Sequence, residues 1–147
     1  MNEKGITQEL VQDRVLDWVK RVHHLYMTIK DWLHLIEGCR VVEHQDATMY
    51  EELMHRFGLR PQAMPTLDIY QDDELIARMK PIGLWIIGAN GRVDLMSRHG
   101  GAQIIDESEP FQESKWIAHD REHFLEGQLL TRDYVLRKLG MPNHECV

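Results

Sequence analysis

Three acidic residues, Asp94, Asp106 and Glu107, lie near two glycine turns in the sequence, Asn90-Gly91 and Gly100-Gly101. If Gly100-Gly101 forms a two-residue hairpin turn, Asp94 faces Glu107 directly across the two strands. A register shifted by one residue would pair Asp94 with Asp106 instead. Opposed carboxylates destabilise a sheet unless a proton, an arginine or a metal ion neutralises them.

Two interpretations of this carboxylate pair are open. In the first, Arg92 lies on the same face of the strand as Asp94 and neutralises the pair, or the strand ends splay and are solvated. In the second, the carboxylates bind a divalent cation, Mg²⁺ or Mn²⁺, together with a glutamate from an earlier helix. The candidate metal ligands are then Asp94, Asp106, Glu107 and Glu52, and the candidate catalytic residues are Asp94 and Glu107.

The middle of the chain resembles the PD-(D/E)xK nuclease core. The resemblance consists of a predicted helix with Glu51 and Glu52, followed by a meander with Asp94 and a later acidic pair. It implies metal-dependent cleavage of phosphodiesters. The family pattern has a lysine two residues after the second acid, where this sequence has Ser108 or Glu109.

The segment His119-Asp120-Arg121-Glu122-His123 matches the inverted zincin motif H-x-x-E-H. On a helix, this spacing lets two histidines share one zinc ion. Only a short tail, which holds Glu126 and Glu145, follows to provide a third ligand. We therefore interpret the segment as the solvated start of a helix with Asp120 as its N-cap.

A long amphipathic helix is predicted from Thr7 to Glu37. Thr7 is a suitable N-cap residue, and Gly38 is suited to the left-handed conformation that ends many helices. Apolar residues recur at steps of three and four, which places them on one side of the helix. This seam consists of Val11, Val15, Trp18, Val22, Leu25, Ile29, Trp32 and Ile36.

Short apolar runs separated by turn residues predict an antiparallel sheet after the helix. A meander is expected from the strands Leu84–Gly88, Arg92–Ser97 and Gln103–Asp106, and a hairpin from Leu67–Tyr70 and Leu75–Met79. The predicted core residues are Trp18, Val22, Leu25, Ile29, Leu84, Ile86, Val93, Leu95 and Ile104.

Three short helices complete the predicted fold. Thr48 to Glu51 forms a capping box that opens a helix ending before Gly58. Asp120 and Thr131 are candidate N-caps of two C-terminal helices. The sequence therefore predicts a single α+β domain over residues 1–147, with a long N-terminal helix packed on an antiparallel β-meander and short C-terminal helices.

The composition is typical of a globular protein, with 147 residues, 43% hydrophobic and 28% charged. A net charge of −7 disfavours nonspecific binding to nucleic acid, although a local basic stripe could override it. The longest apolar run, Leu84 to Ile87, is too short to span a membrane. Cys39 and Cys146 form no metal or disulfide pattern. We expect a cytoplasmic protein without a cofactor.

Two functions from different classes are consistent with these features. The favoured hypothesis is a noncatalytic protein-interaction module, because the apolar seam of the N-terminal helix exceeds what one small sheet needs. This seam predicts a homodimer formed through the helix, although the chain's own sheet could cover the same stripe. The alternative is a divalent-metal-dependent phosphodiesterase or nuclease-like enzyme that uses the clustered carboxylates.

Overall fold

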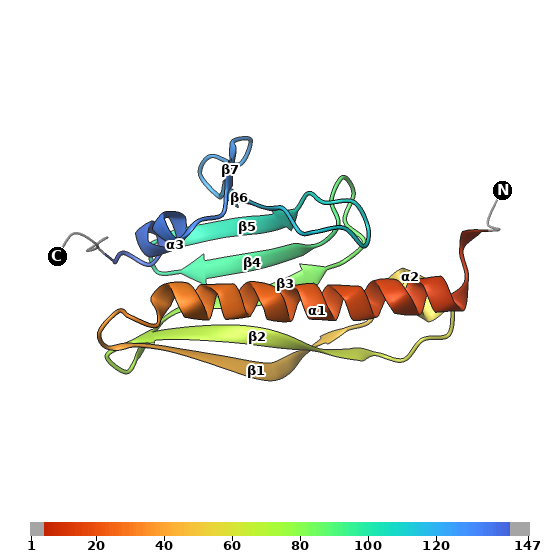
Figure 1. Cartoon of the computed structure of the whole chain (residues 1–147), viewed down its shortest axis with the longest axis horizontal. Coiled ribbons are helices and arrows are strands. Elements are labelled where there is room, and N and C mark those ends of the chain that lie inside the picture. The colour runs from red at the N-terminus through yellow and green to blue at the C-terminus, as the bar shows by residue number, and fades with distance from the viewer. Residues whose placement is uncertain (1–4, 142–147) are drawn as a thin grey trace.

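The computed structural model describes residues 5–141 and shows the α+β architecture predicted from the sequence (Figure 1). A long helix, α1, packs on an antiparallel sheet of seven strands in these residues, in the meander order β1 to β7. The strands are β1 (Cys39–Met49), β2 (Gln62–Gln71), β3 (Glu74–Gly83), β4 (Arg92–Ser97), β5 (Gly100–Asp106), β6 (Trp116–Asp120) and β7 (Gly127–Leu129). The helices are α1 (Gln8–Leu33), α2 (Glu52–Arg56) and α3 (Arg132–Lys138).

Helix α1 begins where the sequence predicts and ends earlier. The Thr7 hydroxyl accepts a hydrogen bond from the Leu10 backbone N–H at 3.0 Å, which confirms Thr7 as the N-cap. The helix ends at Leu33 because the next residues form tight turns, with the Ile36 N–H bonded to the Leu33 carbonyl. Gly38 has a φ of 80°, so it reverses the chain into β1.

The apolar seam of α1 is covered by the chain's own sheet. Val11, Val15 and Trp18 are each at most 2% exposed, and the seam remains buried as far as Ile29. No residue of that stripe is left for a second helix before Trp32, which is half-buried. The seam therefore gives no argument for a dimer that forms through α1.

The hairpin between β2 and β3 has the predicted position. Asp72 and Asp73 form its turn with φ values of 51° and 70°. Positive φ at both central residues is the geometry of a type I′ turn, which matches the twist of two antiparallel strands. Aspartate tolerates this conformation better than most residues.

The expected strand Leu84–Gly88 is wrong. Strand β3 extends to Gly83 and pairs with β4, so that Lys80 lies opposite Asp94. Residues 84–91 therefore form an irregular loop between these two strands, with one isolated bridge between Ile86 and Ala89. The loop also leaves Ile86 half-buried, whereas every other predicted core residue is buried.

The capping box is also wrong, although helix α2 exists. Thr48 belongs to β1, and Glu51 occupies the N-cap position without capping the helix through its side chain. Its carboxylate instead accepts hydrogen bonds from the backbone N–H groups of Leu84 at 2.8 Å and Trp85 at 3.2 Å. Glu51 thus satisfies two donors of the irregular loop that no neighbouring strand can pair.

One of the two predicted C-terminal helices is present. Thr131 caps α3 by accepting a hydrogen bond from the Tyr134 N–H. The helix expected after Asp120 is absent, because His119 and Asp120 end strand β6. Because the H-x-x-E-H segment is not helical, its two histidines do not have the spacing that would let them share one zinc ion. The Asp120 carboxylate instead accepts a hydrogen bond from the Tyr134 hydroxyl.

The two faces of the sheet differ in what covers them. Helix α1 runs along one face, and α3 packs at the end of the same face, where the Arg132 Nε donates to the Trp32 carbonyl of α1 at 3.1 Å (Figure 1). No helix of residues 5–141 covers the other face. Among the same residues, no helix is both long and apolar enough to cross a membrane.

Candidate functional site

Asp94 is neutralised by Arg92, as the first interpretation of the carboxylate pair predicts. The Arg92 Nε and Nη2 atoms lie 2.8 and 2.9 Å from the two carboxylate oxygens of Asp94. This bidentate bond raises the pKa of the Arg92 guanidinium. The direct cross-strand neighbours of Asp94 are Lys80 and Gln103, not another acid.

The expected pairing of Asp94 with Glu107 or Asp106 is wrong because the β4–β5 turn lies earlier than predicted. Arg98 and His99 form the turn, and Ser97 pairs with Gly100. The Ser97 hydroxyl holds this turn, since the His99 backbone N–H donates to it at 3.1 Å.

The other candidate ligands are separated from Asp94. Asp106 points to the α1 side of the sheet, whereas Glu107 is exposed beyond the end of β5. Glu52 is exposed on α2 and lies 3.8 Å from Arg56. Within the part of the chain that the structure describes, no three His, Cys, Asp or Glu side chains are grouped to hold a metal ion.

A buried ion pair that the sequence did not predict joins Arg21 of α1 to Asp106 of β5. The Arg21 Nη1 lies 2.7 Å from Asp106 Oδ2 and 2.8 Å from the Asn90 carbonyl oxygen, and its Nε lies 2.7 Å from Asp17. The Asp106 carboxylate has no exposed surface. The signal in the sequence is the position of Arg21, which is three residues after Trp18 and therefore in phase with the apolar seam.

Asp106 also holds both ends of the loop that follows β5. Its Oδ1 accepts hydrogen bonds from the backbone N–H groups of Ser108 and Lys115, each at 2.9 Å. Burial by itself raises the pKa of Asp106, but hydrogen bonds from Ser114, Lys115 and Ser108 outweigh it and hold the pKa below its usual range. Asp106 is thus an ionised anchor that joins α1, β5 and this loop.

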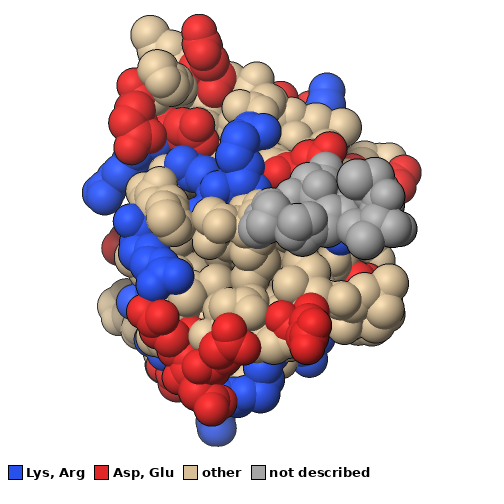
Figure 2. All heavy atoms as spheres, turned by 90° about the vertical axis from the view of Figure 1, so that its left-hand side faces the viewer, with Lys and Arg blue, Asp and Glu red and all other residues tan. Residues whose placement is uncertain are grey.

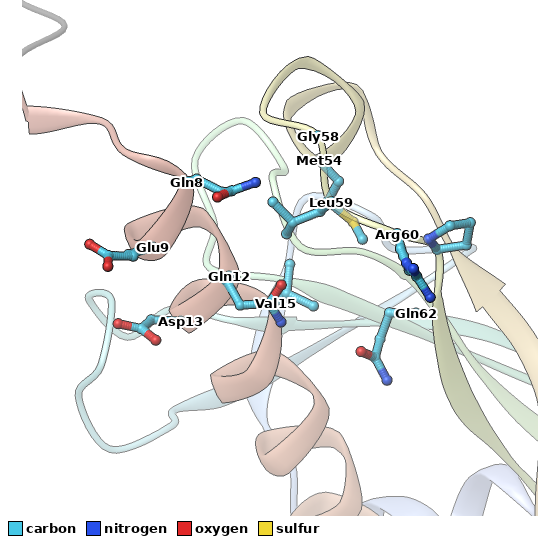
Figure 3. A pocket seen from close by; sticks show the side chains of 11 residues that line it. Gln8, Glu9, Gln12, Asp13, Val15, Met54, Gly58, Leu59, Arg60 and Gln62 are labelled. Atoms are coloured by element: carbon cyan, nitrogen blue, oxygen red, sulfur yellow. The ribbon is translucent and has the colours of Figure 1, made fainter.

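A pocket of about 440 Å³ lies between the start of α1 and the segment after α2. In Figure 3 the amide groups of Gln8 and Gln12 point toward the loop that holds Leu59, whereas the carboxylates of Glu9 and Asp13 point away from it. The Gln8 amide already donates to the Phe57 carbonyl oxygen at 3.0 Å. The residues of this pocket therefore hold α1 against the segment after α2. We do not interpret the pocket as a catalytic site.

The face of the sheet opposite α1 is the second candidate for a binding surface. Residues directly opposite each other in an antiparallel pair share a face, so the register identifies its members. Since Val93 and Leu95 are buried toward α1, Asp94 and Met96 point the other way. The open face, as we call it, contains Asp68, Arg78, Lys80, Arg92, Asp94, Met96, Ile105, Ile117 and Leu129.

Apolar and charged side chains are interleaved on the open face, where Arg92 lies opposite Ile105 and Met96 lies opposite Arg78. Ile105, Ile117 and Leu129 lie opposite one another on β5, β6 and β7. Met96 and Leu129 are 47% and 59% exposed. The nearby Arg78 guanidinium binds both carboxylate oxygens of Asp68, and this hydrogen bonding lowers the pKa of Asp68.

Charges of both signs alternate at the end of the molecule where the β2–β3 and β4–β5 turns lie. Figure 2 shows Lys and Arg side chains between two groups of Asp and Glu on this side. Arg98 lies 2.7 Å from Glu74, and Lys138 lies 3.3 Å from Asp120. A continuous basic stripe of the kind that attracts nucleic acid is not seen on this side.

Comparisons with protein-family models, with curated proteins and with solved structures found no match for this chain.

Proposed function

We propose that this protein is a noncatalytic interaction module that associates with a second copy of itself through the open face. The observation that carries this proposal is the apolar row formed by the half-buried Ile105 and Ile117 and the 59% exposed Leu129, on a sheet whose other face is buried under α1 and α3. Sheets commonly pack face to face with side chains interdigitating between them. The favoured partner surface is therefore the sheet and not α1, whose seam is already covered.

The size of the open face supports a weak dimer. Seven strands about 4.8 Å apart and about 20 Å long give a face of roughly 600 Å². A standard interface buries about 800 Å² on each partner, so the expected complex is transient, with a dissociation constant in the micromolar range. A twofold dimer places the same face on both sides, and this face has an apolar row and side chains of both charges that can complement themselves.

Sedimentation velocity over a range of protein concentrations tests this proposal. We expect the wild type to shift from a 17.3 kDa monomer toward twice that mass as its concentration rises. Met96→Glu replaces an exposed apolar side chain of the open face with a carboxylate and should weaken the dimer at least about tenfold. Because Met96 is half-exposed, this variant should fold normally, which circular dichroism can verify.

Met27→Glu is the matched control, since Met27 is 59% exposed and lies on α1, away from the open face. It should leave the dimer unchanged. If Met27→Glu disrupts the dimer and Met96→Glu does not, the interface lies on α1 and the proposed surface is wrong. A wild type that stays monomeric at the highest soluble concentration contradicts self-association altogether.

A cytoplasmic location without a cofactor belongs to the same proposal. Its support is the sequence, which has two unpatterned cysteines, Cys39 and Cys146.

A further inference from the structure

A pocket of about 520 Å³ lies on the α1 side of the sheet, between α1 and the segment from Gln112 to Trp116. Buried Leu25 and Leu130 line it, together with the half-buried indoles of Trp32 and Trp116. Its volume falls in the range of small-molecule sites, which are mostly apolar with a few polar groups. We call it the Trp pocket.

The sides of the Trp pocket are held in place by hydrogen bonds that exist without a ligand. Asp106 binds the Lys115 backbone N–H and pairs with Arg21, which also lines the pocket. At the other end, the Arg132 Nε binds the Trp32 carbonyl oxygen. A buried ion pair is a costly way to stabilise a fold, and here it fixes the loop that forms one wall. A preformed wall lowers the entropy that a ligand would lose on binding.

The charges at the rim favour an anion. Lys20 and Lys115 are exposed on opposite sides of the pocket, and neither ammonium forms an ion pair with any residue from 5 to 141. Glu113 is the one acid of the lining without such a pair, because Asp17 is bound to Arg21. Two free cations beside a pocket are notable in a chain whose net charge is −7.

We propose that the Trp pocket binds a small organic anion. Its flat apolar part packs against Trp32 and Trp116, and its carboxylate, sulfonate or phosphate group pairs with Lys20 and Lys115. Aromatic side chains favour flat apolar groups, and the two lysines supply point charges that do not demand one anion geometry. This site lies mainly on the α1 side of the sheet and shares one residue, Leu129, with the open face.

Two dyes that differ in one charged group test the proposal. 8-Anilinonaphthalene-1-sulfonate has the required anion and flat rings, and N-phenyl-1-naphthylamine has the same rings without the sulfonate. We expect Lys20→Gln and Lys115→Gln each to weaken binding of the sulfonate about two- to fivefold, as for an exposed ion pair, and to leave the neutral dye unaffected. Lys30→Gln, outside the pocket lining, makes the same change in net charge and should have no effect.

Nuclear magnetic resonance locates the dye independently of these variants. The indole N–H signals of Trp32 and Trp116 should shift on titration with the sulfonate, whereas that of Trp85, which does not line the pocket, should stay in place. Absence of saturable binding at millimolar dye overturns the proposal. So does binding that Lys20→Gln and Lys115→Gln leave unchanged, or binding that Met96→Glu abolishes, since the dye would then occupy the open face.

Discussion

At the scale of single residues, Arg92 and Asp94 illustrate how a carboxylate can be recognised as structural. Two parallel hydrogen bonds from one guanidinium occupy both oxygens of Asp94. A divalent cation would have to displace this guanidinium before it could bind, and the other candidate acids point elsewhere. Asp94 therefore has a structural role, and the proposed interface involves the face on which it lies and not its carboxylate.

Asp106 is the residue whose loss should cost the fold most among the acids. Asp106→Ala leaves Arg21 as a buried cation without this partner and frees both ends of the loop, so it should lower the free energy of unfolding by about 3–5 kcal/mol. Urea denaturation followed by tryptophan fluorescence measures this change. Arg21→Met with Asp106→Leu should recover part of the loss, because the charge left without a partner is then that of Asp17, which is partly exposed to solvent. A cost below about 1 kcal/mol for Asp106→Ala would contradict the anchoring role.

At the scale of the elements, the loop between β3 and β4 depends on a glycine that touches α1. Gly91 has a φ of 128°, and a Cβ atom there would overlap the indole ring of Trp18. Gly91→Ala should therefore cost about 2–4 kcal/mol from backbone strain and overpacking together. Gly88→Ala is the control, since Gly88 has a φ of 81° and open space around it.

Gly88→Ala should cost only the strain of the left-handed conformation, about 1 kcal/mol. Thermal melts of both variants compare the two costs. Equal losses of stability in the two variants would mean that the contact with Trp18 adds nothing to the cost of Gly91→Ala.

The elements that sequence predicts well are those specified by local spacing. The three-four repeat and Thr7 define α1 within a few residues, and the polar turn at Asp72-Asp73 defines one hairpin. The turn predicted at Gly100-Gly101 is wrong because both glycines belong to β5. Gly101 is buried in β5, where a Cβ atom would press on the Leu95 carbonyl oxygen, so it serves close packing.

The missed contacts are long-range. Arg21 and Asp106 are 85 residues apart in the chain. Periodicity can place Arg21 on the seam of α1, but it cannot say which strand lies beneath it. An error of one turn position also changed every partner in β5, because strand register is fixed by the turn. This is why the fold class was predictable from the sequence and the candidate carboxylate site was not.

At the scale of the whole molecule, three carboxylates with lowered pKa values join different parts of the fold. Asp106 links β5 to α1, Asp68 links β2 to Arg78 of β3, and Asp120 links β6 to Tyr134 of α3. For Asp120, burial opposes ionisation, but hydrogen bonds from Tyr134 and Lys138 lower the pKa below its usual range. Protonating these groups should therefore weaken contacts across the entire sheet at once.

The sign of the resulting pH dependence follows from proton binding. Each pKa is lower in the folded state than the ordinary aspartate value of about 3.9, so the unfolded chain binds more protons between the two values. The stabilisation is complete above about pH 5 and is lost as the pH falls below about 4, through the folded pKa values. We expect the free energy of unfolding in urea to be nearly level from pH 7 to 5 and then to fall steeply toward pH 3. Asp106→Asn should be less stable at pH 7 and lose less stability between pH 5 and pH 3, because one linked proton has been removed. If the wild type and Asp106→Asn lose the same free energy of unfolding over that interval, Asp106 does not contribute to the acid response. The assignment of an ionised Asp106 to the folded state would then be wrong.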